Sequence, residues 1–263
     1  MSAISATSAP QKNDLPLIPA RLLGGPTVLL EYGGLRLLTD PTFDDPGVYP
    51  LTEDFALVKT APPRARPADL RPLDAVLLSH DQHPDNLDHS GRALLASVPV
   101  TFTTPAGAGR IDGEARGLAE WESATLARPD GGTVTVTAVP AIHGPDGIGQ
   151  QVMGDVTGFV LTSDGLPSVY VSGDNASLDA VRRIAERFGP VDTAVLFIGA
   201  VRADQVGGEL ITLDSESATE AARILGARRV VAAHMEGWEH FREGPDDVVK
   251  AFAAAGLAHT LEA

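Results

Sequence analysis

A dense group of polar residues follows the apolar run Ala75–Leu78, and no other stretch of the chain is better suited to chemistry. Residues 79–89 read Ser-His-Asp-Gln-His-Pro-Asp-Asn-Leu-Asp-His, so imidazoles and carboxylates alternate at short spacing. Holding such groups together at the end of a buried strand is costly unless they bind something, and a divalent cation accepts both neutral imidazole and carboxylate. On this segment alone, a solvated loop that caps a helix explains the pattern equally well.

Three later residues sit at or just past the ends of other apolar, β-prone runs: His143, Asp174 and His234. A single histidine in such a place is more often structural than ligating. Strand ends that share one edge of a sheet nevertheless converge on folding, so the repeated placement favours a metal site. The small residues Ser172 and Gly173 before Asp174 would let the backbone come close, and that carboxylate could bridge two ions.

The absence of cysteine restricts the chemistry further. It excludes disulfides, thiolate nucleophiles and cysteine-based zinc or iron–sulfur sites, so a transition metal would be held by His, Asp, Glu or Asn. The chain also lacks the G-x-S-x-G, P-loop, G-x-G-x-x-G and H-E-x-x-H patterns. Metal-assisted chemistry is therefore the best-supported class.

Composition and charge set the remaining limits. The 263 residues are 43% hydrophobic and 21% charged, which predicts a packed core. The net charge of −15 disfavours nucleic acid and anionic membranes as partners. No window is apolar and long enough to cross a bilayer, and the start lacks the features of a signal peptide. We expect a disordered tail over residues 1–16, a single domain over 17–263 and a cytoplasmic protein.

The elements that must position these residues change character along the chain. Gly33-Gly34 predicts a hairpin between strands 27–32 and 35–39, and the second strand ends in Asp40, which propensity favours as a turn-capping residue. Further expected strands are 74–79, 98–103, 121–126, 133–139, 157–162, 168–171, 193–198 and 229–233. Expected helices are 87–95, 178–188, 214–225 and 246–255. Residues 52–73 and 144–155 are expected to be loops. The order predicts an α/β fold of two packed sheets with helices outside.

These motifs, in this order, resemble the metallo-β-lactamase fold superfamily. The similarity spans about residues 22–241. Within the superfamily, the chain resembles the branch that contains ascorbate-6-phosphate lactonase and the phospholipase D that acts on N-acyl-phosphatidylethanolamine. The motifs that carry it are Thr39-Asp40-Pro41, the histidine-rich loop, Pro140-Ala-Ile-His143, Ser172-Gly173-Asp174 and the last strand ending in His234. The resemblance implies an αββα four-layer sandwich whose metal site lies at one edge of the sheets. It also implies one or two ions, most often Zn²⁺, with Mn²⁺ or Fe²⁺ as alternatives.

The histidine-rich loop departs from the family pattern H-x-H-x-D-H. When the loop is aligned from the strand side, His80 takes the first His position. When it is aligned backwards from Leu87, His83 takes the second His position and Asp85 the Asp position. Asn86 then replaces the last His. The two alignments differ by one residue, so either the loop carries an insertion or Asp81 replaces the first His. We favour His80.

The resemblance implies two ion positions of unequal quality. One would use His83, His143 and Asp174. The other would use Asp85, Asp174 and His234, and it has lost one imidazole to Asn86, which is a weaker donor to a transition metal. One tightly held ion, or two of unequal affinity, is the expectation.

The leading hypothesis is metal-assisted hydrolysis of an ester, lactone or phosphodiester bond in a small molecule. A bound ion lowers the pKa of its water toward about 7, and Asp85 would orient that water or accept its proton. His240 could line the pocket beside His234, although a packing role explains it better.

The main rival to hydrolysis is a metal-poor, non-catalytic member of the fold that binds a small molecule or a partner. The substitution at Asn86 is the feature that supports this rival. A nuclease is disfavoured by the net charge and by the lack of a basic stripe. The substrate and any homo-oligomeric state are not determined by the sequence.

Overall fold

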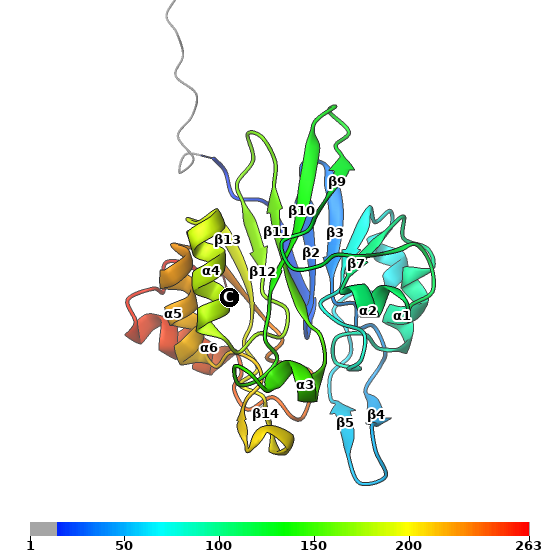
Figure 1. Ribbon diagram of the computed structural model, residues 1–263, viewed down its shortest axis with the longest axis vertical. Helices are drawn as coiled ribbons and strands as arrows, with labels where there is room; N and C mark the ends of the chain where they lie inside the picture. The colour runs from blue at the N-terminus through cyan, green and yellow to red at the C-terminus, as the bar shows by residue number, and fades with distance from the viewer. Residues whose placement is uncertain (1–14, 263) are drawn as a thin grey trace, which may run out of the picture.

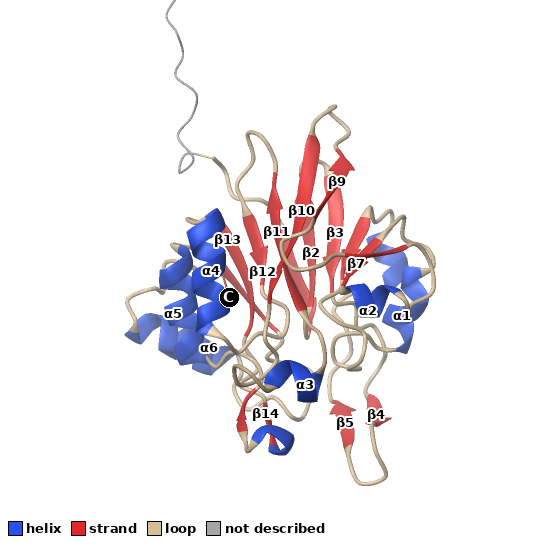
Figure 2. Ribbon diagram, viewed as in Figure 1, coloured by secondary structure: helices blue, strands red, loops and turns tan. Residues whose placement is uncertain are grey.

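A computed structural model describes residues 15–262, in which two β-sheets pack face to face with helices on both outer sides (Figures 1 and 2). Residues 1–14, most of the predicted tail, and residue 263 lie outside the described part. Helices α1 (His89–Leu95) and α2 (Pro105–Ala108) lie beside one sheet. Helices α4 (Leu178–Phe188), α5 (Ser215–Leu225) and α6 (Pro245–Ala254) cover the other. The predicted four-layer α/β sandwich is confirmed.

The sheets are mixed. The first has the order β1-β2-β3-β6-β7-β8, with strands β1 (Ala20–Gly24), β2 (Thr27–Tyr32), β3 (Leu35–Thr39), β6 (Ala75–Leu77), β7 (Thr101–Thr103) and β8 (Ala115–Gly117). The second has the order β17-β16-β13-β12-β11-β10-β9. Its strands are β9 (Ser123–Ala127), β10 (Thr133–Pro140), β11 (Thr157–Thr162), β12 (Val169–Val171), β13 (Thr193–Phe197), β16 (Arg229–Ala233) and β17 (Leu261–Glu262). Two small hairpins complete the strands: β4 (Gly47–Pro50) with β5 (Ala56–Lys59), and β14 (Arg202–Ala203) with β15 (Glu209–Leu210).

The predicted hairpin around Gly33-Gly34 is present, with β2 and β3 antiparallel and Tyr32 paired with Leu35. Both glycines adopt positive φ, +62° and +81°, which the tight turn requires. From β3 onward the strands of this sheet run parallel, so Asp40 and the residues after β6 emerge at the same edge. That parallel pairing brings the first strand ends together.

Two segments expected to be loops contain regular structure. Residues 52–73 include β5 and a 3-10 helix (Pro67–Leu70), and residues 144–155 include α3 (Gly149–Met153). The expectation missed β5 because the prolines and the arginine-rich stretch of residues 62–67 favoured a loop over the whole segment; β5 ends at Lys59. That lysine is buried, since its ammonium lies 2.8 Å from a carboxylate oxygen of Asp88. A second 3-10 helix (Asp204–Val206) precedes β15.

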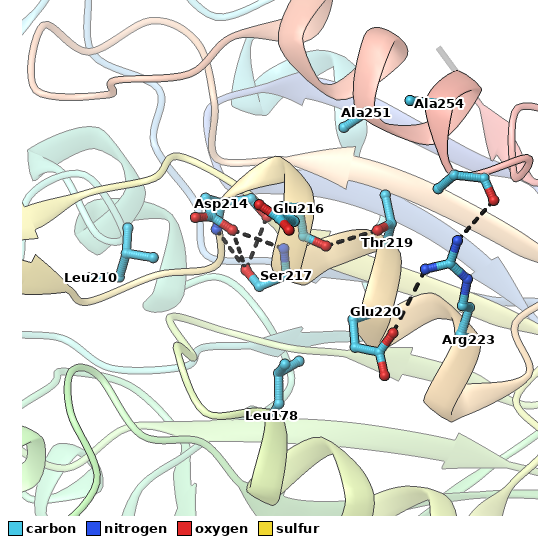
Figure 3. A pocket seen from close by; sticks show the side chains of 11 residues that line it. Leu178, Leu210, Asp214, Glu216, Ser217, Thr219, Glu220, Arg223, Ala251 and Ala254 are labelled. Atoms are coloured by element: carbon cyan, nitrogen blue, oxygen red, sulfur yellow. Dashed lines mark hydrogen bonds and ion pairs between the residues drawn. The ribbon is translucent and has the colours of Figure 1, made fainter.

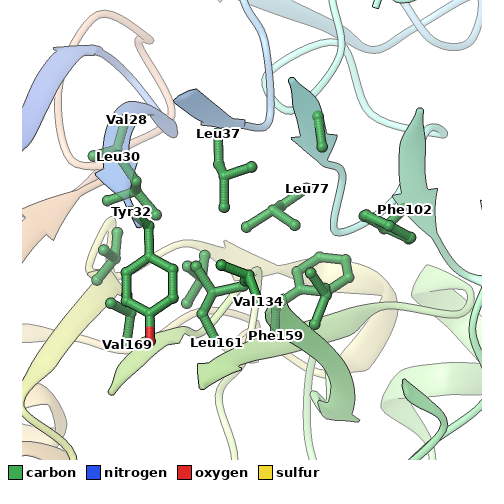
Figure 4. Packing of buried hydrophobic residues seen from close by; sticks show 14 of the residues in the cluster. Val28, Leu30, Tyr32, Leu37, Leu77, Phe102, Val134, Phe159, Leu161 and Val169 are labelled. Carbon is green, nitrogen blue, oxygen red and sulfur yellow. The ribbon is translucent and has the colours of Figure 1, made fainter. Parts of the chain in front are cut away.

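The main core lies between the two sheets (Figure 4). Alternate side chains of each strand face inward, so Leu30, Leu37 and Leu77 of one sheet meet Val134 and Leu161 of the other. A second buried cluster fills the space between the seven-stranded sheet and helices α4, α5 and α6. Burial of this kind supplies most of the folding free energy and fixes the strand ends against one another.

The helices of the second layer begin and end as the sequence predicts. Asp214 caps α5 by accepting a hydrogen bond from Ser217 N at 2.8 Å, and Gly226 ends it with φ +59°. A pocket of about 780 Å³ lies along this helix (Figure 3). Arg223 in its lining pairs with Glu220 and donates to the carbonyl of Ala255 after α6. No helix of the described residues is long and apolar enough to cross a membrane.

A network of carboxylates ties the β4–β5 hairpin to the start of α1. Asp88 caps α1 through Gly91 N at 2.8 Å, and its second oxygen accepts from Lys59. Asp44 accepts hydrogen bonds from Tyr49 and from the backbone and ring of His89. Burial raises the pKa of Asp44, but the hydrogen bonds outweigh it and lower the pKa from 3.8 to about 2.

The low pKa of Asp44 predicts a pH-dependent contribution to stability. The folded state binds this proton more weakly than the unfolded chain does, so the stabilisation is complete above pH 4 and disappears as the pH falls from about 4 to 2. We expect Asp44→Asn to lower the free energy of unfolding at pH 7 by about 1–2 kcal/mol. Urea denaturation at pH 7 and pH 3 measures this. The difference in free energy of unfolding between Asp44→Asn and wild type should be smaller at pH 3 than at pH 7. Asp45→Asn, which removes an exposed neighbouring carboxylate, should have the same free energy of unfolding as wild type.

Candidate metal centre

Five strand-end segments meet at one edge of the two sheets. The loop after β6 carries His80, His83 and Asp85, and the residues after β10, β12 and β16 carry His143, Asp174 and His234. These side chains form two clusters that share Asp174. Within each cluster, one ligand atom of every residue lies within 4.8 Å of those of the others. The fifth segment, after β3, ends in Asp40.

The first cluster contains His80, His83, His143 and Asp174. His80 Nε2 lies 2.8 Å from His83 Nδ1, and His143 Nε2 lies 3.5 Å from Asp174 Oδ2. The three imidazole rings are 4.8 to 5.4 Å apart between centroids. Three ring nitrogens and one carboxylate oxygen at such spacing suit a tetrahedral transition metal.

Hydrogen bonds on the outer nitrogens orient two of these rings. His143 Nδ1 donates to the carbonyl of Ile211 at 2.6 Å, and His80 Nδ1 lies 2.9 Å from Ser79 Oγ. In both residues Nε2 is therefore the atom that faces the cluster. Burial, together with the neighbouring imidazoles, lowers the pKa of His80 and His83, so both rings are neutral at pH 7. Neutral imidazole is the form that binds metal.

The second cluster contains Asp85, Asp174 and His234. His234 Nε2 lies 3.2 Å from Asp85 Oδ2, and its Nδ1 lies 3.4 Å from Asp174 Oδ1. His240 also reaches Asp85 Oδ2, with Nε2 at 3.0 Å. Burial raises the pKa of Asp85, but the imidazoles of His234 and His240 outweigh it and hold the pKa well below its usual range. Asp85 is therefore ionised at neutral pH.

Unsatisfied polar atoms indicate that these clusters fit a cation. Within the described residues, neither buried ring nitrogen of His234 makes a well-directed hydrogen bond, although they lie 3.2 and 3.4 Å from oxygens of Asp85 and Asp174, and the buried Asn86 Oδ1 has no partner. Burial holds the pKa of Asp40 well above its ordinary value, even though Asp40 Oδ1 accepts hydrogen bonds from Ser79 N and Ser79 Oγ at 2.8 Å each. Buried polar groups almost always have a partner. A divalent ion would supply one for His234 and for the carboxylates around it.

Four of the candidate residues lie outside both clusters: Asp81, Asp40, Asn86 and His240, which contacts Asp85. Asp81 turns away and forms a double hydrogen bond with Arg110, from Nε at 3.0 Å and from Nη2 at 2.6 Å. Asp40 holds Ser79 rather than joining a cluster, and Asn86 Nδ2 donates to Asp174 Oδ1 at 3.2 Å. Sequence reasoning missed Arg110, because nothing local marks a residue 29 positions away as the partner of Asp81.

Two strand-end residues have a strained backbone. Asp40 has φ +25° and His234 has φ +56°, a region that costs a non-glycine residue free energy. His234 is held there by its N–H, which donates to the carbonyl of Gly25 at 2.7 Å. Next to Asp174, a Cβ on Gly173 would lie 2.8 Å from Ser79 Cβ, so glycine is needed for the close approach. Strain at His234 thus falls on a residue of the second cluster, and strain at Asp40 falls on the residue that holds Ser79 next to His80.

We expect Asp81→Asn to leave the number of bound metal ions unchanged. The contacts with Arg110 position the loop from outside, and loss of such a partner weakens metal affinity by about tenfold. His80→Ala should instead remove an ion, because it deletes a donor from the first cluster. Elemental analysis after dialysis, followed by zinc competition titration, measures both variants. Loss of an ion in Asp81→Asn with retention in His80→Ala would assign the ligand to Asp81.

Comparison with known proteins agrees with this geometry. The family model described as beta-lactamase superfamily domain matches residues 35–235. A UPF0173 metal-dependent hydrolase of Methanosphaerula palustris is 29% identical over 229 residues, covering 85% of this chain and 86% of that protein. An N-acyl-phosphatidylethanolamine-hydrolyzing phospholipase D of Caenorhabditis elegans is 25% identical, covering 82% of this chain and 63% of that protein.

Two solved structures have the same fold. The isothiocyanate hydrolase from Delia radicum gut bacteria superposes with a TM-score of 0.75 at 21% identity, covering 92% of this chain and 94% of that one. A possible metal-dependent hydrolase from Veillonella parvula gives a TM-score of 0.76 at 18% identity, covering 94% and 95%. The family match extends from β3 to the residue after His234 and so contains every residue of the two clusters. The chain therefore belongs to the β-lactamase superfamily and has the metallo-β-lactamase fold.

Proposed function

We propose that this protein is a metal-dependent hydrolase that cleaves an ester or lactone bond in an uncharged small molecule. The convergence of His80, His83, His143 and Asp174 with the second cluster carries the proposal. A divalent cation held by these residues would supply hydroxide at neutral pH by lowering the pKa of water. The names of similar proteins, several of them metal-dependent hydrolases, support the same class.

The chain's own residues would orient the nucleophile. Asp85 is ionised, and His234 and His240 both contact its Oδ2, which holds that oxygen in place and leaves Oδ1 free of these imidazoles. Asp85 Oδ1 is then the atom that accepts a proton from the attacking water. The side chain of His240 is 19% exposed, which places it on the open side of the centre.

Exposed apolar side chains on two segments at one end of the molecule support an uncharged substrate with an apolar part. Six large hydrophobic residues are exposed in the described chain, and five of them lie on the β4–β5 hairpin or around α3: Val48, Leu51, Phe55, Ile148 and Val152. In Figure 1, the β4–β5 hairpin, α3 and β14 all lie at the same end of the molecule. Acidic residues beside them, such as Glu53 and Asp54, would repel a phosphodiester.

Elemental analysis of protein purified without added metal, followed by a hydrolase panel, tests the proposed function. The panel contains p-nitrophenyl acetate, p-nitrophenyl octanoate, γ- and δ-lactones, and bis-p-nitrophenyl phosphate, each assayed with and without the metal found. We expect ester or lactone hydrolysis that is lost on chelation and restored by the metal. Protein that carries metal but hydrolyses nothing, or that carries none, would favour the non-catalytic binding alternative.

The β4–β5 hairpin should raise kcat/KM only for substrates with an apolar tail. Burying an aromatic side chain against such a tail contributes about 1.5–3 kcal/mol, so Phe55→Ser should lower kcat/KM for the octanoate ester by about tenfold or more. The acetate ester should change less than about twofold, because it cannot reach the hairpin. Val249→Ser is the matched control, since Val249 is equally exposed but lies on α6. Equal losses on both esters would show that Phe55 supports the fold instead.

A further inference from the structure

The two clusters share Asp174 but offer different donor atoms. The first offers three imidazole nitrogens and one carboxylate oxygen. The second has two carboxylates, from Asp85 and Asp174, and a single imidazole from His234. An ion in the first position would meet mainly nitrogen, and an ion in the second mainly oxygen. This difference between the positions follows from the residues alone.

Asn86 adds a further oxygen donor beside the second cluster. The residue is fully buried and directly follows Asp85 in the loop. Its Nδ2 donates to Asp174 Oδ1 at 3.2 Å, which leaves Oδ1 as the free end of the amide. That Oδ1 has no partner among the described residues. Leaving a buried carbonyl oxygen without a partner costs about 1–3 kcal/mol, and a cation between Asp85 and Asp174 would remove that cost.

Oxygen-rich and nitrogen-rich positions select different ions. Imidazole suits Zn²⁺ and Fe²⁺, whereas carboxylate and carbonyl oxygens suit Mn²⁺ and Mg²⁺. We propose that Asn86 Oδ1 is a ligand of the second ion position and makes it a site for a hard divalent cation, represented by Mn²⁺, beside a zinc-type ion in the first position. The inference rests on the proposed function only in assuming that the clusters bind metal.

Sequential metal loading tests the inference without any assay of hydrolysis. Metal-free protein receives one equivalent of Zn²⁺ and is then titrated with Mn²⁺, while the electron paramagnetic resonance signal of free Mn²⁺ reports binding. A second equivalent of Zn²⁺ is added last, to measure how readily it displaces Mn²⁺. Wild type should bind one Mn²⁺ beside one Zn²⁺.

Variants at Asn86 separate the donor atom from the fold. Asn86→Ala should weaken Mn²⁺ binding by about tenfold or more, because it removes the oxygen, and Asn86→Asp should retain it. Asn86→His should let the second equivalent of Zn²⁺ displace Mn²⁺ at a concentration at least about tenfold lower than in wild type. Gln82→Ala is the control. Gln82 carries an amide in the same loop, but it is exposed and belongs to neither cluster, so Mn²⁺ binding should not change.

Several results would overturn the inference. Unchanged Mn²⁺ affinity in Asn86→Ala would show that the amide is not a ligand. Two Zn²⁺ ions of equal affinity in wild type, with no Mn²⁺ uptake, would show that the second position is not selective for hard ions, while leaving the proposed hydrolase intact. A protein that binds no divalent ion at all would contradict the proposed function together with this inference.

Discussion

Replacing Asp174 by alanine is expected to remove metal binding at both positions and to lower kcat/KM for any hydrolysed substrate by at least about 10³-fold. Asp174 is the one residue common to both clusters, and its two oxygens face different sides: Oδ2 lies 3.5 Å from His143 Nε2, and Oδ1 lies 3.4 Å from His234 Nδ1. Its loss therefore deletes a donor from each position at once. No other single substitution in the centre does so.

Two further variants make the Asp174→Ala result specific. His83→Ala should lose the first ion and keep the second, because His83 belongs only to the first cluster. Asp155→Ala removes a carboxylate from the loop after α3, outside both clusters, and should change neither metal content nor rate. Elemental analysis and steady-state kinetics measure all three, with circular dichroism as the check on folding. Retention of two ions by folded Asp174→Ala protein would refute the bridging role.

Gly91→Ala is expected to lower the free energy of unfolding by about 3 kcal/mol, the upper end for overpacking a well-packed site. Gly91 lies in the first turn of α1, and a Cβ there would stand 1.8 Å from the carbonyl oxygen of Pro41. Backbone atoms cannot rotate away as a side chain can, so either α1 or the end of β3 must move. Pro41 follows Asp40, which holds Ser79 next to His80, and the shift should therefore also weaken metal binding.

Gly109→Ala is the control for Gly91→Ala. Gly109 follows α2 with φ −80°, and a Cβ there would meet its nearest atom at 3.7 Å, an ordinary contact. Its free energy of unfolding should stay within about 0.5 kcal/mol of wild type. Urea denaturation of the metal-free proteins measures both, so that metal loss does not add to the difference. Equal midpoints for the two variants would show that α1 shifts without cost.

Local signals predicted much of the fold. The Gly33-Gly34 hairpin, the amphipathic helix from Leu178 to Phe188 and the capped α5 helix depend on turn chemistry and periodicity within a few residues, and all three are present. The strand β5 was missed because the prolines and arginines of residues 52–73 favoured a loop, and because the burial of its last residue, Lys59, depends on Asp88, 29 residues later. From the sequence alone a charged side chain is predicted to be exposed, because burial requires a partner that the local sequence does not reveal.

The sequence by itself determined the candidate donor residues and their place at strand ends, because a strand's apolar run and the polar residue that ends it are neighbours in the chain. It also carried enough of the family motif to identify the fold. Only the tertiary structure decided which donors lie together: Asp81 turns to Arg110, His240 reaches Asp85, and Asn86 is left with a free Oδ1. Those outcomes depend on packing between segments far apart in the chain, where side-chain direction is set by the sheets and helices around it.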